Sequence, residues 1–325
     1  MTRAFVTGCA GFIGSRLTES LLEDGLTVVG VDCFNSNYGR EQKLRNLDRA
    51  KQWEEFEFLP LDLARGELHD LLEECDLTFH LAAEPGVRAS WGSRFEAYLR
   101  NNVLATQHML DAAQAHPGKR FVYASSSSIY GQAERFPTPE DTVPAPMSPY
   151  GVTKLGGEHL CQLYHSNYGV ETVSLRYFSV YGPRQRPDMA FHRFCRAAID
   201  GEALTVFGDG EQTRDFTFVG DVVEATRAAA TAEGVVGGIY NIGGGSRISV
   251  NQALKLVSEL AGRKLDIDYV ERQYGDVRDT GADTSRARID LDFQPKVEFG
   301  DGLREEFEWL SATLHDERLA SGRPR

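Results

Sequence analysis

Tyr150 and Lys154 stand four residues apart, about two dozen residues after a serine run at 125–128. Residues spaced i and i+4 lie on one face of a helix, one turn apart. An ammonium held near a phenol favours the phenolate, so Lys154 is expected to lower the pKa of Tyr150 toward neutral pH. Such a phenolate can take a proton from an alcohol, and the lysine can also hold ribose hydroxyls. The pair alone is a weak signal, because many chains of this length carry one on a helix surface.

A glycine-rich turn near the N-terminus supplies a second chemical signal. Three β-prone residues lead into Gly8, Gly11 and Gly14, and an amphipathic run at 15–23 follows. In a strand–turn–helix unit, one glycine permits the tight turn, a second lets the backbone approach a pyrophosphate, and a third allows close helix packing. The first amides of the helix would then face the anion. The pattern predicts a dinucleotide site.

Asp32 narrows the identity of the dinucleotide. The run 27–31 is typical of a second strand, and it ends on this carboxylate, which could accept hydrogen bonds from both hydroxyls of an adenosine ribose. No arginine follows directly to receive a 2′-phosphate. We therefore predict NAD rather than NADP as the cofactor.

Apolar runs that alternate with amphipathic runs indicate the fold class. Further strands are predicted at 56–59, 77–81, 120–124 and 171–177, and helices at 41–51, 68–74, 95–115 and 149–168. Strands and helices that alternate at this spacing form a parallel sheet covered on both faces. We therefore predict an α/β fold with a doubly wound, Rossmann-like parallel sheet over residues 1–180. The serine run then follows the C-terminal end of a strand, where ligands bind in such sheets.

The composition of the chain changes beyond about residue 182. Prolines and glycines divide this part into short pieces around a predicted helix at 191–200. We predict a smaller, mainly substrate-binding lobe over 181–325, with a segment near 239–250 returning to the first domain as a strand at 239–242. A helix at 250–262 follows, with Ser249 as its N-cap. The polar tail after Leu314 is expected to fray.

Length, charge and cysteine content exclude several classes of function. The chain has 325 residues, 41% of them hydrophobic, and a net charge of −13, which argues against nucleic acid as a partner. No apolar run approaches the about 18 residues that span a bilayer, and the N-terminus does not resemble a signal peptide. We therefore expect a cytoplasmic protein with no membrane contact. The five cysteines form no CxxC pair, so neither a disulfide framework nor a metal site is predicted.

Together, the motifs resemble a known family over nearly the whole chain. They are Thr7-Gly8-x-x-Gly11-Phe12-Ile13-Gly14, Asp62-Leu63, His80-Leu81-Ala82-Ala83, Asn101-Asn102-Val103, the serine run, Tyr150 with Lys154, Arg176-Tyr177-Phe178 and Arg214-Asp215-Phe216. This combination is similar to the extended short-chain dehydrogenase/reductases, in the branch of nucleotide-sugar epimerases and dehydratases. The resemblance implies a catalytic set of Ser126, Tyr150 and Lys154. It also implies that NAD is bound by Gly8, Gly11, Phe12, Ile13, Gly14, Asp32, Asp62, Leu63, Leu81, Ala82, Ala83, Asn102, Tyr150 and Lys154.

The residues after Ser126 distinguish between branches of that family. Dehydratases that resemble this chain have Asp-Glu directly after the catalytic Ser or Thr, and decarboxylases have a Glu two positions after it. Here Ser127 and Ser128 stand at those positions, and a hydroxyl cannot serve as a carboxyl acid or base. Dehydration and decarboxylation are therefore disfavoured. Reversible oxidation of one carbinol, by Tyr150 and a retained NAD, remains.

Two further stretches indicate the sugar. The segments 84–90 (EPGVRAS) and 181–190 (YGPRQRPDMA) are similar to those of UDP-glucuronate 4-epimerases. An arginine beside the substrate suits a carboxylate, because a guanidinium can bind it with two hydrogen bonds. The resemblance predicts conversion of UDP-glucuronate to UDP-galacturonate through a transient 4-keto sugar. Candidates for the carboxylate and its surroundings are Arg186, Ser127, Ser128 and Ser179, where Ser179 replaces the Asn that is frequent in the family.

The rest of the substrate site is assigned from later motifs. Gln273 stands where many relatives have an arginine, so the diphosphate is expected to fall mainly to Arg214, with Arg272 or Arg278 beside it. Asp276 is placed to hold the uridine ribose. Arg88, in the first of the two stretches, completes the predicted substrate contacts.

Three other functions remain open at this point. The first is a 4-epimerase of a neutral sugar, UDP-glucose or UDP-N-acetylglucosamine, in which Arg184 and Arg186 would only stabilise the fold. The others, which the residues favour less, are a UDP-glucuronate decarboxylase and a non-catalytic NAD-binding protein. Relatives in this family also form dimers through two helices, so we expect a homodimer in which 95–115 and 149–168 pair across a two-fold axis.

Overall fold

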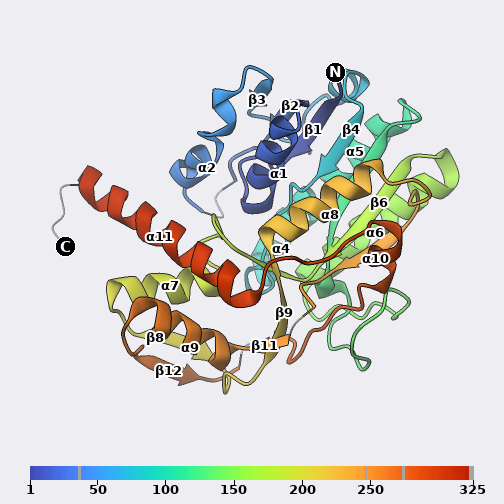
Figure 1. Cartoon of the computed structure of the whole chain (residues 1–325). Coiled ribbons are helices and arrows are strands. Elements are labelled where there is room, and N and C mark those ends of the chain that lie inside the picture. Colours follow the sequence, from blue (N-terminus) through green and yellow to red (C-terminus); the bar gives the residue numbers. More distant parts are fainter. Residues whose placement is uncertain (36–37, 246, 273–274, 322–325) are drawn as a thin grey trace.

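The computed structural model of the protein describes residues 1–35, 38–245, 247–272 and 275–321. Its centre is a seven-stranded parallel sheet with the strand order β10-β6-β5-β4-β1-β2-β3 (Figure 1). The strands are β1 (Arg3–Thr7), β2 (Thr27–Val31), β3 (Phe56–Leu59), β4 (Leu77–His80), β5 (Arg120–Ser126), β6 (Glu171–Tyr177) and β10 (Ile239–Ile242). The order reverses between β1 and β4, and this reversal opens a crevice at the carboxyl ends of the strands. The predicted α/β fold with a doubly wound sheet is confirmed.

Helices cover both faces of the sheet because adjacent strand residues point to opposite sides. Ala4 and Val6 pack in one apolar cluster with Leu17 of α1, whereas Phe5 packs in a second cluster with Met109 of α5. Helices α1 and α8 therefore lie on one face, and α3, α5 and α6 lie on the other (Figure 1). The helices of this region are α1 (Phe12–Glu23), α2 (Arg40–Leu47), α3 (His69–Glu73), α4 (Phe95–Tyr98), α5 (Ala105–Gln114), α6 (Pro149–Tyr168) and α8 (Val219–Thr231).

Two predicted helices are divided in the structure. The helix expected at 41–51 is α2 followed by a 3₁₀ turn, η1 (Ala50–Gln52). The helix expected at 95–115 is continuous in direction, but a π-helical turn, η4 (Leu99–Leu104), separates α4 from α5. Within η4, the Asn102 carbonyl accepts a hydrogen bond from the Thr106 hydroxyl at 2.7 Å, and a side chain that bonds back in this way competes with the regular helical pattern. The remaining 3₁₀ turns are η2 (Arg88–Ser90), η3 (Gly92–Arg94) and η5 (Ser127–Ile129).

A smaller lobe is built below the carboxyl end of the sheet. It contains a three-stranded sheet of order β11-β9-β7 and a two-stranded sheet of β12 and β8 (Figure 1). Its elements are β7 (Ser179–Tyr181), α7 (Ala190–Asp200), β8 (Leu204–Phe207), β9 (Thr213–Phe218), β11 (Arg247–Ser249), α9 (Val250–Ala261), β12 (Ile267–Val270) and α11 (Phe299–Ser321). Helix α10 (Ser285–Asp290) packs instead against β10 at the edge of the main sheet. Between these elements, β10 returns to the main sheet and pairs in parallel with β6.

The C-terminal helix α11 is longer than the sequence predicts. The tail was expected to fray after Leu314, but the helix continues to Ser321 and extends past α7 (Figure 1). Two ion pairs hold its last turns: Arg45 of α2 to Glu317, at 2.6 Å, and Arg318 to Asp200. These contacts join residues that are far apart in the sequence, so the local sequence does not reveal them. In the part of the chain that the structure describes, no helix has the length and apolarity needed to cross a membrane.

Candidate active site

The glycine turn between β1 and α1 is shaped by close backbone approach. A Cβ on Gly14 would lie 2.1 Å from the Gly8 carbonyl oxygen, and Gly8 has a φ of +70°. A side chain at Gly14 would therefore force the helix away from the turn. Helix α1 begins at Phe12, so its first amides face the crevice between β1 and β4. The local structure matches the predicted dinucleotide site.

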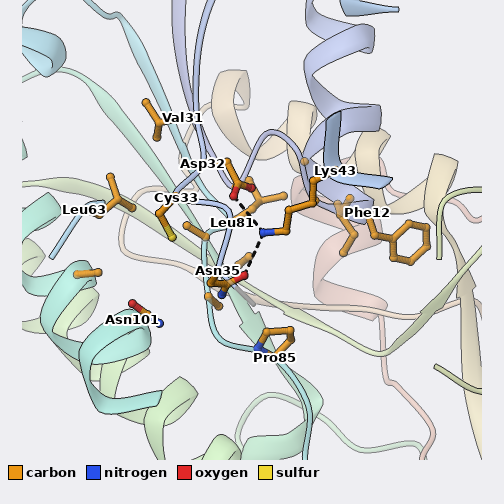
Figure 2. A pocket seen from close by; sticks show the side chains of 18 of the residues that line it. Phe12, Val31, Asp32, Cys33, Asn35, Lys43, Leu63, Leu81, Pro85 and Asn101 are labelled. Carbon is orange, nitrogen blue, oxygen red and sulfur yellow. Dashed lines mark hydrogen bonds and ion pairs between the residues drawn. The ribbon is translucent and has the colours of Figure 1, made fainter. Parts of the chain in front are cut away.

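A large cavity extends from this turn along the carboxyl ends of the strands (Figure 2). All but one of the residues predicted to bind the cofactor line it: Gly8, Gly11, Phe12, Ile13, Gly14, Asp32, Asp62, Leu63, Leu81, Ala82, Ala83, Tyr150 and Lys154. The cavity joins the glycine turn to Tyr150, so one extended ligand can contact both. Its size and its lining fit a dinucleotide.

Asn102 is the exception among the predicted cofactor contacts, because it does not line this cavity. Its side-chain oxygen accepts a hydrogen bond from the Glu84 amide at 2.6 Å, and its nitrogen donates to the Glu84 carbonyl at 3.0 Å and to the Thr153 hydroxyl at 2.9 Å. The side chain is buried, so it fixes the loop after β4 against α6 and does not line the cavity. Its neighbour Asn101 lines the cavity in its place.

Lys43 and Asn35 are cavity residues that the sequence analysis missed. The Lys43 ammonium donates to Asp32 Oδ1 and to Asn35 Oδ1, both at 3.0 Å (Figure 2). The Phe34 amide also donates to Asp32 Oδ1, at 2.7 Å. Among the described residues these contacts all involve Oδ1, so Oδ2 is the oxygen that can accept from a ribose. A lysine in the first turn of a helix gives no local signal, because its partner Asp32 lies eleven residues away.

The catalytic side chains are presented by the end of β5 and the start of α6. Ser148 caps α6 by accepting a hydrogen bond from the Gly151 amide at 3.1 Å, and Pro149 stands in the first turn. This start places Tyr150 at the cavity and Lys154 one turn further along. The Ser126 hydroxyl, at the last residue of β5, is close enough to the Tyr150 phenol to act on its pKa. The structure thus brings together the three predicted catalytic residues.

Glu158, one turn after Lys154, holds these elements in register. Its carboxylate is buried and accepts from the Ser125 hydroxyl at 2.7 Å. It also accepts from two nitrogens of Arg176 on β6, at 3.0 and 2.7 Å. A charge pair that is buried and bonded at both ends is costly to break from one side. This pair therefore ties α6 to β5 and β6 beneath the catalytic groups.

The charge balance at Tyr150 differs from the prediction. Burial raises the pKa of the Tyr150 phenol, while the hydrogen bond from Ser126 and the charge of Arg186 act to lower it. Burial also lowers the pKa of Lys154 to about 8, and its ammonium lies 4.7 Å from the centre of the Tyr123 ring. The expected lowering by Lys154 is therefore not seen in the polypeptide itself, because the loss of water outweighs the nearby cations.

A second cavity contains most of the predicted sugar-binding residues. Ser127, Ser128, Ser179, Arg214 and Asp276 line it together. Among the described residues of its wall, Asp276 carries the only carboxyl group. That carboxylate is paired with Arg88 at 2.6 Å. The wall is therefore rich in hydroxyls next to Ser126 and has no unpaired carboxyl acid or base there.

A third cavity shares Arg214 and Asp276 with the second and adds Arg272 and Arg278. The Arg214 guanidinium donates to the backbone carbonyls of Thr213, Val277 and Arg278 at 2.7 to 2.9 Å. Burial lowers the pKa of this group. Arg214 thus anchors the chain around 277–278 and brings positive charge to both cavities. Gln273, at which an arginine is common in relatives, lies outside the described residues.

Arg184 and Arg186 have different environments. Arg184 donates to Glu19 of α1 at 2.7 Å, so it stabilises the fold. Arg186 lines the first cavity beside Tyr150 and is paired with Asp188 at 2.9 and 3.0 Å. The glycine turn belongs to the first domain, whereas Arg186 comes from the smaller lobe, in the loop between β7 and α7. Arg186 is therefore the arginine of this segment that a ligand near Tyr150 can meet.

Comparison with known proteins decides the family. A model described as the NAD dependent epimerase/dehydratase family matches residues 4–243. The chain belongs to this family. NAD is therefore its cofactor, in agreement with the glycine turn and with the carboxylate at the end of β2.

Individual relatives of this family member match it over almost its full length. It is 42% identical to a Bacillus subtilis (strain 168) protein named an uncharacterized UDP-glucose epimerase, with 97% of this chain and 100% of the relative covered. It is 38% identical to the UDP-glucuronate 4-epimerase of Thermodesulfobacterium geofontis (strain OPF15), with 95% and 96% covered. The crystal structure of the Bacillus cereus UDP-glucuronic acid 4-epimerase with UDP-glucuronic acid and NAD is 40% identical, with a TM-score of 0.94 and 96% and 100% covered.

Proposed function

We propose that the protein is an NAD-dependent UDP-sugar 4-epimerase and that it converts UDP-glucuronate into UDP-galacturonate. The observation that carries the proposal is the wall of the second cavity. There Ser127 and Ser128 directly follow Ser126, at positions where an eliminating or decarboxylating relative needs carboxyl groups, and Ser179 lines the same wall. The names of the relatives from Thermodesulfobacterium geofontis and Bacillus cereus support the same sugar.

In the proposed reaction, Tyr150 takes the proton of the C4 hydroxyl and later returns it. Ser126 shares this hydrogen bond and holds the phenol toward the sugar. Lys154 contributes positive charge to the buried site and is placed to hold the ribose of the cofactor. Bound NAD supplies the hydride acceptor and donor. Because there is no net redox change, the cofactor is retained and is not consumed.

The carboxylate of the uronate needs a firm hold during the reaction. A 4-keto uronate is a β-keto acid and loses CO2 when the breaking bond aligns with the carbonyl π-system. We assign the carboxylate to Ser127, Ser128 and Ser179, with Arg186 opposite. Hydrogen bonds that fix its plane would keep the bond misaligned. Asp188 holds the Arg186 guanidinium in one orientation, which reduces the entropy lost on binding.

In this proposal the two parts of the chain bind different ligands. Residues 1–180 bind NAD and carry the catalytic groups, while 181–325 mainly bind the sugar nucleotide and send 239–250 back to the first domain. Arg214 and Arg278 supply positive charge for the diphosphate. Asp276 would accept from the uridine ribose, and Arg88, which pairs with it and lies 4.2 Å from the centre of the Phe207 ring, closes that end.

We also propose a homodimer in a reducing cytoplasmic compartment. Large apolar side chains are exposed on η4 and α6, which pack against one another: Leu99, Leu104, Val152, Leu163 and Tyr168. A second copy that covers these side chains would remove them from water. The five cysteines are all free thiols, which supports a reducing environment.

The deciding experiment is a substrate panel without added NAD. Purified protein is incubated with UDP-glucuronate, UDP-glucose or UDP-N-acetylglucosamine, and the products are identified by mass spectrometry and NMR. The proposal expects UDP-galacturonate from UDP-glucuronate, with NAD in the purified protein. A UDP-pentose as the sole product would instead show a decarboxylase, and no turnover of any sugar would favour a non-catalytic NAD-binding protein.

Arg186→Ala distinguishes the uronate from the neutral-sugar alternative, which the Bacillus subtilis relative's name favours. Activity on UDP-glucuronate should fall by about 100-fold, as expected for a lost charged hydrogen bond of about 3 kcal/mol, while activity on UDP-glucose should change little. Arg193→Ala is the matched control, because Arg193 is exposed on the following helix. Equal losses on both sugars would show that Arg186 is structural.

A further inference from the structure

The segment from Gly182 to Arg186 has a strained backbone. Gly182 has a φ of +128°, and Arg184 has a φ of +75°, which is uncommon for a residue with a side chain. A Cβ on Gly182 would lie 2.8 Å from a methyl group of Val219. A conformation of this kind persists only where surrounding contacts hold it.

Three residues of the segment, Arg184, Gln185 and Gly182, are each held by contacts to other parts of the chain. Arg184 is bonded to Glu19 of α1, at 2.7 Å. The buried Gln185 side chain donates to the Val180 carbonyl at 3.1 Å and accepts from the His192 amide at 3.0 Å. The third contact, at the start of the segment, is to α11.

Glu306 of α11 makes this third contact. Its Oε2 accepts the Gly182 amide at 2.7 Å, and the residue is fully buried. Its Oε1 is buried and has no hydrogen-bond partner among the described residues. A buried carboxyl that is only half satisfied costs stability, so its presence calls for a reason other than packing. Burial raises the pKa of Glu306 well above its ordinary value, while the hydrogen bond from the Gly182 amide acts to lower it.

The surroundings of Glu306 fix its position. On the same helix, Leu303 and Leu310 are buried, and the Phe299 ring stacks on Phe216 with centroids 5.5 Å apart. Phe299 also contacts the Tyr181 ring, with centroids 5.2 Å apart. The carboxyl is therefore presented to the Gly182 amide from a rigid support, four residues before Arg186.

We infer that Glu306 is a positioning residue for sugar selection: it fixes the segment from Gly182 so that Arg186 meets the uronate carboxylate beside Tyr150. This inference rests on the proposed function. It assigns to the C-terminal helix, which lines neither of the cavities next to Tyr150, control over the recognition of the acidic sugar.

The test compares Glu306→Met with Glu306→Gln. Methionine has a similar length but offers no oxygen to the Gly182 amide, whereas glutamine retains a side-chain oxygen that can accept from it. For Glu306→Met, the KM for UDP-glucuronate should rise by about 10-fold, the effect of a lost hydrogen bond, with little change for UDP-glucose. Glu306→Gln should restore the wild-type ratio of the two sugars.

Leu310→Ala is the matched control, because it destabilises α11 without touching the segment. Its thermal midpoint should fall, and its ratio of UDP-glucuronate to UDP-glucose activity should stay at the wild-type value. If Glu306→Met and Leu310→Ala change the ratio equally, or if Glu306→Met leaves it unchanged, Glu306 has only a structural role.

The double variant Arg186→Ala with Glu306→Met separates the two proposals. If Glu306 acts through Arg186, the double variant is no weaker on UDP-glucuronate than Arg186→Ala alone, whereas additive losses contradict the inference. A wild-type protein that does not epimerise UDP-glucuronate contradicts the proposed function. In that case the amount of NAD that copurifies is compared between Glu306→Met, Arg186→Ala and the double variant, because Arg186 also lines the cofactor cavity.

Discussion

Lys43 and Asp32 form a buried ion pair at the end of β2, with 3.0 Å between Nζ and Oδ1. Both side chains are less than a tenth exposed, and both line the cofactor cavity. The lysine thus compensates the carboxylate that we propose binds the adenosine ribose. Burying a carboxylate at this depth without a partner would cost stability, because the charge would lose its hydration with nothing in exchange.

Lys43→Met is expected to weaken NAD retention and to lower the free energy of unfolding by about 3 kcal/mol, because it leaves one partner of a buried pair alone. NAD content is measured after denaturation of the purified protein, and stability is measured by urea unfolding. Lys51→Met, at an exposed lysine of η1, is the control and should change neither. Full NAD content in Lys43→Met would show that Asp32 needs no partner.

Tyr150→Phe tests the assignment of the catalytic acid and base. Loss of the phenolic oxygen should reduce kcat by about 1,000-fold, as is usual for a positioned proton-transfer group, and should leave NAD bound. Tyr168→Phe removes an exposed hydroxyl from the end of the same helix and should keep full activity. Epimerisation by Tyr150→Phe at a rate near that of wild type would move the proton transfer to another residue.

His80 is held in one protonation state by its neighbours. The Thr7 hydroxyl accepts the Leu81 and Ala82 amides at 3.1 and 3.0 Å, so its proton must point to His80 Nδ1, 2.8 Å away. The Nε2 of His80 then carries the hydrogen and faces the Thr106 hydroxyl at 2.9 Å. Burial lowers the pKa of His80 to about 3. The neutral ring therefore supports the backbone that lines the cofactor cavity.

This network predicts a loss of stability in acid. The unfolded histidine titrates near pH 6.5, so between about pH 6.5 and 3 the unfolded state binds one more proton than the folded state, and stability falls as pH falls. Between pH 7 and 4 this group should contribute about 3 kcal/mol of the loss, and that share should vanish in His80→Gln. The change is measured as urea unfolding of each protein at both pH values. His159→Gln, at an exposed histidine of α6, should keep the wild-type slope.

Leu163→Asp tests the proposed dimer. Leu163 is 53% exposed on α6, and a charge there should prevent burial against a second copy, so the molar mass in solution should halve. The mass is measured by light scattering after gel filtration. Ile289→Asp, at an 81% exposed residue of α10, should leave the mass unchanged. A wild-type protein with the mass of one chain would contradict the dimer directly.

The sequence predicted what local patterns encode. The alternation of strands and helices, the glycine turn and the Tyr150–Lys154 spacing each depend on residues within a few positions of one another. Lys43 and Glu306 were missed because their partners are remote in sequence, and a helix surface does not reveal which lysine or glutamate is buried. The raised pKa of Tyr150 was missed for a related reason: burial is a property of the packed site and cannot be read from the spacing of two residues.

Phe178 alone separates β6 of the main sheet from β7 of the smaller one, and its amide is bonded to the Ile242 carbonyl at 2.9 Å. The residue before it, Tyr177, lines the first cavity, next to the glycine turn, and the residue after it, Ser179, lines the second cavity. This stretch of three consecutive residues therefore contributes to the walls of both cavities. A ligand in either cavity should therefore change the affinity of the other cavity for its ligand. NAD should bind more tightly in the presence of the sugar nucleotide, and the sugar nucleotide should bind more tightly by the same factor in the presence of NAD.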